Sequence, residues 1–268
     1  MKQTLEYVNS QPSWVRLVQI SKRETTMMAT NSTVLAMEAL HDLSVASNSA
    51  ASHIVSEQYL EAFAAIRTAT SQAHALAPLI AQCQAEEAGK NDLHEVMVEP
   101  LPNGCALSVV ENTDGCAFSC PFLLIRYHLD KETLAKKVSL RYMKTLSAVA
   151  IFNMALACHL QHTIADKCHK AEVLSRRAQS LYAQAANLLE ESQIRPDQSV
   201  MPIYLAICTN LVQLSLYEGR LDGVRIWKGK FDATIAKVTT SQRKSWLLRY
   251  FLHLQDMYIG SFVAARTA

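Results

Sequence analysis

The sequence predicts a mainly α-helical protein made of stacked antiparallel helical hairpins, with a short strand-like or irregular insert. Helix breakers are scarce, because 7 Gly and 7 Pro in 268 residues fall far below the roughly 12% that these two residues average in proteins. Helix-favouring alanine occurs 35 times. Apolar residues make up 50% and charged residues 19% of the chain, which suits a sizeable buried core and excludes a chain that is disordered throughout.

Residues 1–30 are expected to form a partly flexible segment before the first helices. Residues 1–20 show neither the apolar stretch nor the small-residue cleavage site of a signal peptide. No uninterrupted apolar run reaches the length of about 18 residues that predicts a transmembrane helix. The seven cysteines are expected to be thiols in a reducing compartment. We therefore expect a soluble cytoplasmic protein, with the nucleus as the open alternative and no membrane partner.

Residues 31–83 are predicted to form the first helical hairpin. Residues 33–83 contain no Gly and a single Pro, Pro78. Four residues recur at spacings of three or four and therefore share one face of a helix: Tyr59, Ala62, Ile66 and Ala69. The polar stretch 55–58 supplies the turn, with Ser56 as the expected N-cap of the second helix.

Residues 84–130 are predicted to be an insert that is extended, forms a β-hairpin or is mobile. Short apolar or alternating runs at 95–98, 106–110 and 117–128 are separated by Pro, Asn and Gly, which are strand and turn signals. We expect a hairpin that pairs 105–110 with 116–125. Helical periodicity then continues through 131–268. The expected helices there are 131–161, 170–191, 201–217, 221–238 and a capping helix at 242–263.

Three segments of the helical parts fall into a common register that resembles the tetratricopeptide repeat. The first unit matches at Ala50, Tyr59, Ala62, Ile66 and Ala69; the second at Asn153, Ala155, Ala178, Tyr182 and Ala185; the third at Asn210, Leu211, Gly219, Leu221 and Val224. The second unit departs from the repeat by an insertion at 161–171, and the third has Lys228 where a large apolar residue is expected, with Trp227 next to it. The resemblance implies a right-handed helical array that binds a peptide or protein partner on its concave face, and one hairpin needs neighbours to bury its apolar side.

The resemblance also limits the kind of partner. Members that bind a peptide carboxylate use Lys and Asn at positions that Ser47, Ala51, Phe152, Leu156, Thr209 and Gln213 occupy here, and none of these matches. We therefore expect a groove lined by apolar and neutral polar groups. The expected partner-binding residues are His53, Phe152, Leu156, His159, Thr209 and Gln213.

Catalytic and metal chemistry is the contrasting hypothesis. A zinc site or an enzyme could use the cluster Cys158, His159, His162, Cys168 and His169, and the insert thiols Cys105, Cys116 and Cys120 could bind metal or pair oxidatively. Ordinary packing explains both groups more simply. No nucleophile elbow, phosphate-binding loop, zinc-protease motif or dinucleotide fingerprint is present. The leading prediction is a non-catalytic interaction scaffold with no cofactor and no metal.

RNA recognition by helical repeats is a third hypothesis. The formal net charge of +2 argues against it, because phosphate binding depends on a surplus of Lys and Arg. We therefore expect no nucleic-acid partner. The sequence does not predict the oligomeric state.

Overall fold

The computed structural model describes residues 35, 38–71, 97–101, 118–125, 140–165, 169–191, 200–238, 245 and 247–255. Three predicted features lie outside the described residues. They are the N-terminal segment 1–30, the strand 106–110 and most of the insert 84–130.

The described residues are mainly helical, which confirms the predicted fold class at that level. Four long helices are α4 (Leu140–Ile164), α5 (His169–Glu191), α6 (Met201–Tyr217) and α7 (Leu221–Ile235). Further helices cover 38–55, 59–71 and 247–255. Pro202 lies in the first turn of α6, where its missing N–H breaks no helical hydrogen bond.

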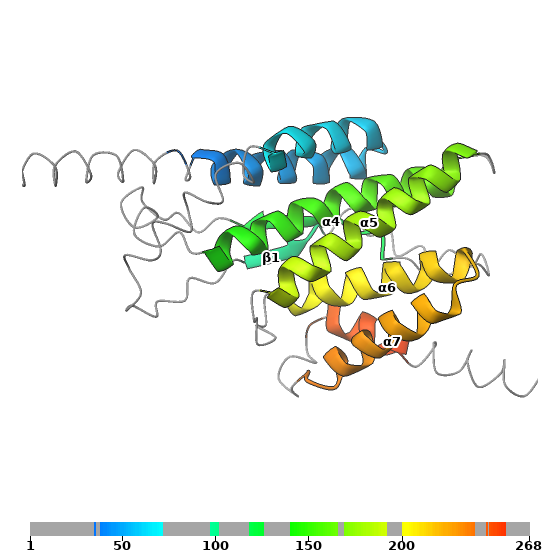
Figure 1. Cartoon of the computed structure of the whole chain (residues 1–268). Helices are drawn as coiled ribbons and strands as arrows, with labels where there is room; N and C mark the ends of the chain where they lie inside the picture. Colours follow the sequence, from blue (N-terminus) through cyan, green and yellow to red (C-terminus); the bar gives the residue numbers. More distant parts are fainter. Residues whose placement is uncertain are drawn as a thin grey trace, which may run out of the picture.

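Helices that are consecutive in the sequence pack against one another. α4 contacts α5, α5 contacts α6, and α6 contacts α7. Figure 1 shows the hairpin 38–71, the α4–α5 pair and the α6–α7 pair following one another across the molecule. Alanines permit the close approach of α4 and α5. Those with no exposed surface are Ala148, Ala150, Ala155 and Ala157 on α4, and Ala178, Ala185 and Ala186 on α5.

Helix α4 contains a long apolar stretch. Its stretch Met143–Ile164 is long and apolar enough to cross a membrane, with a mean hydropathy of 1.4. However, 89% of that window is buried inside the protein, and such burial is typical of a core helix.

Two hairpin turns end their first helix in the same way. Gly219 adopts a left-handed φ of 69° after α6, and Glu57 adopts a φ of 60° after helix 38–55. Each turn has the paired hydrogen bonds of a Schellman motif, with Gln58 N–H donating to His53 O at 2.8 Å in the first and Arg220 N–H to Ser215 O at 2.8 Å in the second. The prediction of Ser56 as N-cap is wrong, because the helical bonds of the next helix begin at the Gln58 carbonyl.

Two short strands form an antiparallel pair against α4. β1 (Met97–Pro100) pairs with β2 (Phe122–Ile125), with Pro100 opposite Phe122. β2 contacts α4. The predicted pairing of 116–125 with 105–110 differs from this register, since the described partner of β2 is 97–100. Turn residues suggested the shorter hairpin, but the strand partner is set by packing on α4, which local turn signals do not encode.

Candidate functional site

The side chain of Asn210, on α6, binds both main-chain groups of Phe118. Its Oδ1 accepts a hydrogen bond from the Phe118 N–H at 2.8 Å. Its Nδ2 donates to the Phe118 carbonyl oxygen at 3.1 Å. Asn210 has no exposed surface and Phe118 is 2% exposed, so both bonds form away from water. An unpaired main-chain group in such a place would cost about 1–3 kcal/mol.

Asn153, on α4, binds Phe122 in the same manner. Its Oδ1 accepts from the Phe122 N–H at 2.9 Å, and its Nδ2 donates to the Phe122 carbonyl oxygen at 2.8 Å. Both residues are fully buried. A side-chain amide carries an acceptor and a donor side by side, which matches the N–H and C=O of a single residue. We call these two pairs, Asn153 with Phe122 and Asn210 with Phe118, the asparagine clamp.

The clamp asparagines occupy matching positions in the two segments that the sequence aligns as its second and third units. The buried Ala155 follows Asn153 by two residues, and the buried Val212 follows Asn210 by two. α4 and α6 contact each other directly, and both amides face the segment 118–122. The same sequence position of the alignment is thus used twice, and it holds the segment 118–122 at two points.

Each clamp asparagine is oriented by a side chain from another helix. Nδ2 of Asn153 donates to Ser47 Oγ at 3.1 Å, and the Ser47 carbonyl lies 3.5 Å away. Nδ2 of Asn210 donates to the Tyr182 hydroxyl at 2.8 Å. Together with the main-chain bonds, these acceptors determine which end of each amide carries the nitrogen. Ser47 and Tyr182 are thus positioning residues.

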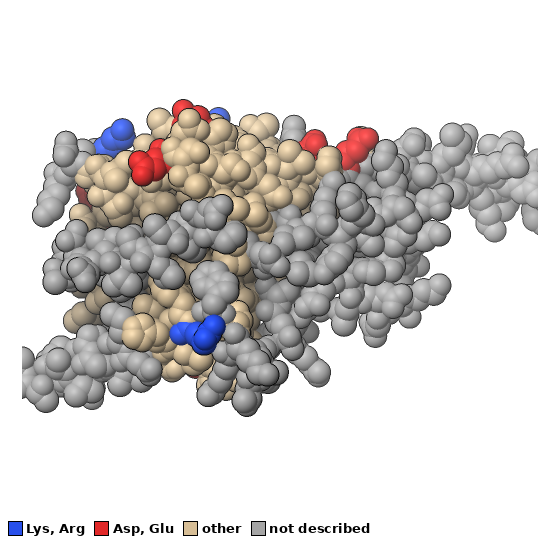
Figure 2. Space-filling view, turned by 180° about the vertical axis from the view of Figure 1, so that it is seen from behind, with Lys and Arg blue, Asp and Glu red and all other residues tan. Residues whose placement is uncertain are grey.

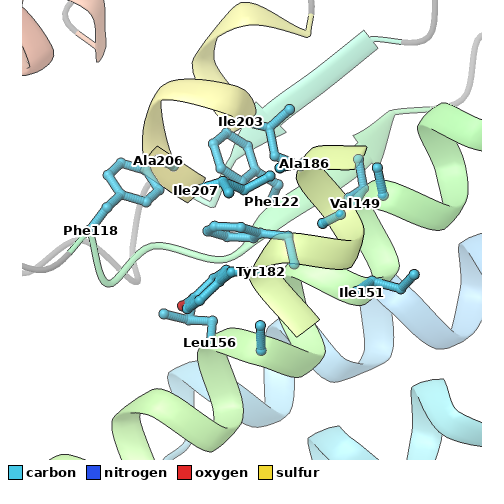
Figure 3. Close-up of a cluster of buried hydrophobic side chains, with 14 of the residues drawn as sticks. Phe118, Phe122, Val149, Ile151, Leu156, Tyr182, Ala186, Ile203, Ala206 and Ile207 are labelled. Carbon is cyan, nitrogen blue, oxygen red and sulfur yellow. The ribbon is translucent and has the colours of Figure 1, made fainter. Parts of the chain in front are cut away.

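The rings of Phe118 and Phe122 complete the site. They stack on each other with centroids 5.4 Å apart and an interplanar angle of 21°. Phe122 meets Phe152 edge-on at 5.2 Å, and Phe118 lies 5.4 Å from Phe251 and 5.9 Å from Tyr250. Figure 3 shows the two rings among side chains of α4, α5 and α6. Burying each ring contributes on the order of 1.5–3 kcal/mol to holding the segment.

His159 and Tyr182 support the clamp as neutral groups. Burial lowers the pKa of His159 to about 3, and the nearby His162 acts in the same direction. Burial raises the pKa of Tyr182 well above its ordinary value. The Tyr182 hydroxyl lies 3.5 Å from His159 Nδ1, which as a neutral imidazole nitrogen can accept the phenolic hydrogen. The phenol oxygen is then available to accept from Asn210.

The structure places the six predicted partner-binding residues in two groups. Four are buried, with exposures of 0% for Phe152, Leu156 and Thr209 and 2% for His159. Phe152 is covered by the phenylalanines of segment 118–125, and the Thr209 hydroxyl donates to the Leu205 carbonyl at 2.9 Å. In this structure these four side chains contact the rest of the chain rather than solvent.

The other two residues are half-buried. His53 Nδ1 and Gln58 Oε1 lie 2.8 Å apart across the first hairpin turn. Gln213 lies on α6, one turn beyond Thr209. They are not brought together with the buried four into one accessible groove.

From the sequence, Asn153 and Asn210 are predicted only as positions of the repeat signature. A signal for their role was present, because each stands in a nearly continuous apolar helix, and an asparagine buried there needs hydrogen-bond partners. Their equal register in two units pointed to a shared task. The identity of the partner segment, 31 and 92 residues away along the chain, had no such signal.

The cysteine and histidine cluster shows no activated group among the described residues. Burial raises the pKa of the Cys158 thiol to about 11, which keeps it protonated at neutral pH. His162 Nδ1 lies 3.0 Å from the Ala171 carbonyl, and its ring packs edge-on against Tyr217. The described residues contain no group of three or more His, Cys, Asp or Glu side chains arranged for a metal. Cys168 and the side chain of His169 lie outside the described part.

Described cysteines occur in two states. Cys158 and Cys208 are free buried thiols, as predicted. Cys120, in the clamped segment and 4% exposed, is disulfide-bonded, so the thiol prediction is wrong for it. Oxidative pairing, the alternative considered for the insert cysteines, is the state found for Cys120.

An open cleft of about 850 Å³ lies between α5, the end of α6 and the start of α7. Its lining includes Arg176, Arg220 and Asp222. Each of these charges is already paired, with Glu172, Glu218 and Arg225 respectively. The cleft therefore offers no surplus charge that would select an ionic ligand.

Charged side chains are sparse on the described part of the face opposite to that of Figure 1. Figure 2 shows isolated acidic and basic groups there, separated by neutral surface. No broad basic patch is visible among those residues.

Comparison of the chain with protein families, with characterised proteins and with solved structures gave no match.

Proposed function

We propose that this protein is a non-catalytic interaction scaffold with the architecture of tetratricopeptide repeats. The asparagine clamp is the observation that carries this proposal. Asn153 and Asn210 each bind the main chain of a non-helical segment of this chain, at matching positions of the aligned segments, which supports a peptide-binding role. Main-chain hydrogen bonds combined with side-chain pockets are one established way in which proteins bind peptide segments.

The state of the described ionisable groups supports a binding role over a catalytic one. A nucleophile must be activated by a lowered pKa or a nearby base, whereas the Cys158 thiol is shifted toward the protonated form. His159, the nearest imidazole in sequence, is buried and neutral. Both groups instead lie in the packed core beside the clamp.

Affinity capture with the tagged full-length chain from its native cells tests this proposal. Every recovered protein is purified and its direct binding measured, with Arg225→Ala on the exposed face of α7 as a matched surface control. The proposal expects at least one direct partner whose binding changes amide exchange in α4, α6 or segment 118–125. Recovery of no direct partner contradicts the proposal. Stoichiometric zinc in the purified protein that is lost in Cys158→Ala would instead favour the metal-dependent alternative.

A further inference from the structure

We infer that the open cleft between α5, α6 and α7 binds a short uncharged peptide segment of a partner protein. The segment would place an apolar side chain in the cleft and offer its main-chain carbonyl groups as hydrogen-bond acceptors. This inference rests on the proposed function and gives it a surface and a kind of partner. The cleft has a volume of about 850 Å³.

The cleft has two walls and a base, each from a different helix. α6 packs against both α5 and α7, and its residues Leu211 and Ser215 line the cleft between them. One wall is a single face of α5, with residues at spacings of three, one and three: Arg176, Gln179, Ser180 and Ala183. The other wall is the start of α7: Leu221, Asp222, Gly223 and Trp227. The α5 wall is about 10 Å long at a rise of about 1.5 Å per residue, which matches about three residues of an extended peptide.

The amide nitrogen of Gln179 is an unused donor in this lining. Its Nε2 is buried and has no hydrogen-bond partner in the described part of the chain. Burying such a donor without an acceptor is unfavourable, so it favours a ligand that supplies one. The terminal torsion of a glutamine side chain is soft, which allows the amide to turn toward an acceptor in the cleft.

The start of α7 supplies main-chain donors to the same cleft. The side chain of Arg220, which precedes α7, makes no capping hydrogen bond. The N–H of Val224 donates to the Arg220 carbonyl at 3.2 Å. The three N–H groups before it belong to Leu221, Asp222 and Gly223, and the first N–H groups of a helix have no acceptor within that helix. Both sources of unused hydrogen-bonding capacity are therefore donors, which a row of peptide carbonyls complements.

The apolar part of the lining provides a place for one side chain. Trp227 is half-buried, and its ring carries the Lys230 ammonium 4.6 Å from its centroid. Leu211 is buried below it, whereas Leu221 is 68% exposed. A single aliphatic side chain entering the cleft would cover these surfaces.

The charges of the lining favour an uncharged segment. Arg176 pairs with Glu172, Arg220 with Glu218, and Asp222 with Arg225. A charged ligand would have to compete with these pairs, whereas the carbonyl group of a neutral peptide needs only the unused donors.

The probe is the blocked peptide acetyl-Ala-Leu-Ala-amide, titrated into the ¹⁵N-labelled full-length chain. The NMR signals of the Gln179 side-chain amide and the Trp227 indole N–H report on the cleft. We expect saturable shifts of both signals with a dissociation constant of about 1 mM or tighter. The matched control acetyl-Ala-Gly-Ala-amide should bind at least about tenfold more weakly, because it lacks the apolar side chain.

Gln179→Leu separates a binding role from a structural one. It should weaken probe binding about fivefold or more, because the donor is lost. It should leave the free energy of unfolding unchanged or higher, because a buried group without a partner is removed. Asn187→Leu, at an exposed position of α5 outside the cleft, should change neither quantity. Unchanged probe binding in Gln179→Leu overturns the inference.

Ala183→Phe is the second variant, and it tests the inference even if Gln179→Leu does not fold. Ala183 is half-buried in the α5 wall, so the larger ring should occupy the cleft and weaken probe binding at least about tenfold. Absence of saturable shifts in the wild type, or equal binding of probe and control peptide, overturns the inference. Binding of the carboxylate-ended peptide acetyl-Ala-Leu-Ala more than about tenfold tighter than the probe would assign the cleft to an anionic ligand and also overturn it.

Failure of this inference is distinguishable from failure of the proposed function. A captured partner that changes amide exchange only in α4 or segment 118–125, together with no probe binding in the cleft, would refute this inference alone.

Discussion

The two halves of the asparagine clamp make the same main-chain bonds but are supported differently. Asn153 is oriented by Ser47 from the first hairpin, with a hydroxyl and a carbonyl both within 3.5 Å. Asn210 is oriented by the single hydroxyl of Tyr182, which is itself next to a buried neutral His159. The first support is duplicated and the second is a chain of single contacts. Two asparagines can therefore make the same main-chain bonds while the side chains that orient them differ in robustness.

Replacing either clamp asparagine should have the largest effect. Asn210→Leu leaves the Phe118 N–H and C=O buried without partners, and Asn153→Leu does the same for Phe122. We expect each to lower the free energy of unfolding by about 3 kcal/mol, measured by urea denaturation. The matched control is Asn187→Leu at an exposed position of α5, which should change stability little. Losses below about 1 kcal/mol at both clamp positions would contradict the assigned roles.

Acid should weaken the side of the clamp that depends on His159. The folded protein keeps His159 neutral down to about pH 3, whereas the unfolded chain binds a proton below its ordinary pKa of 6.5. Stability from this group is therefore present above pH 6.5 and is lost as pH falls toward 3. The linkage amounts to on the order of 2 kcal/mol at pH 5. Urea titrations at pH 7 and pH 5 should show this loss of unfolding free energy. His159→Leu should make the loss smaller. An unchanged pH dependence in that variant would exclude His159 as its cause.

The positioning residues sharpen the comparison directly. Tyr182→Phe keeps the ring but leaves an Asn210 N–H without its acceptor, at a cost of about 1–2 kcal/mol. Ser47→Ala should cost less, about 1 kcal/mol or below, because the Ser47 carbonyl can take over. Parallel thermal and urea unfolding of the two variants checks the order. If Ser47→Ala lost more stability than Tyr182→Phe, our conclusion that Asn210 has the weaker support would be wrong.

The two hairpin turns should respond with opposite signs. Gly219→Ala forces a side chain into a left-handed conformation and should destabilise by about 1 kcal/mol. Glu57→Gly relieves the same strain at a φ of 60° and should stabilise by a few tenths to about 1 kcal/mol. Differential scanning calorimetry of both variants measures the pair. If both variants shifted the melting temperature in the same direction, backbone strain would not be what distinguishes the two turns.

Much of the helical framework was predictable because its signals are local. Low Gly and Pro content, alanine-rich stripes and the Gly219 turn depend on neighbours three or four residues away. The first turn was harder to assign, since Glu57 adopts a left-handed conformation that glycine usually marks. The pairing of β1 with β2 was missed for a related reason, because strand partners are selected by tertiary packing.

The clamp itself was only half predictable. The repeated asparagines were visible in the sequence at Asn153 and Asn210, but their ligand comes from the insert, whose residues carry no helical periodicity. The predicted groove residues Phe152 and Leu156 were assigned by analogy to open arrays, whereas here Phe118 and Phe122 pack on Phe152, and Leu156 is fully buried. Which distant segment of the chain packs on a helix face depends on the whole fold, and the local sequence pattern does not indicate it.

The most direct test of the central claim is residue-resolved amide hydrogen exchange at Phe118 and Phe122 by NMR. We expect both amides to exchange slowly in the wild type. Asn210→Leu should accelerate Phe118 by about tenfold or more while Phe122 stays protected, and Asn153→Leu should produce the reverse pattern. Equal exchange of the two amides in both variants would contradict the claim that each asparagine holds its own residue of the segment.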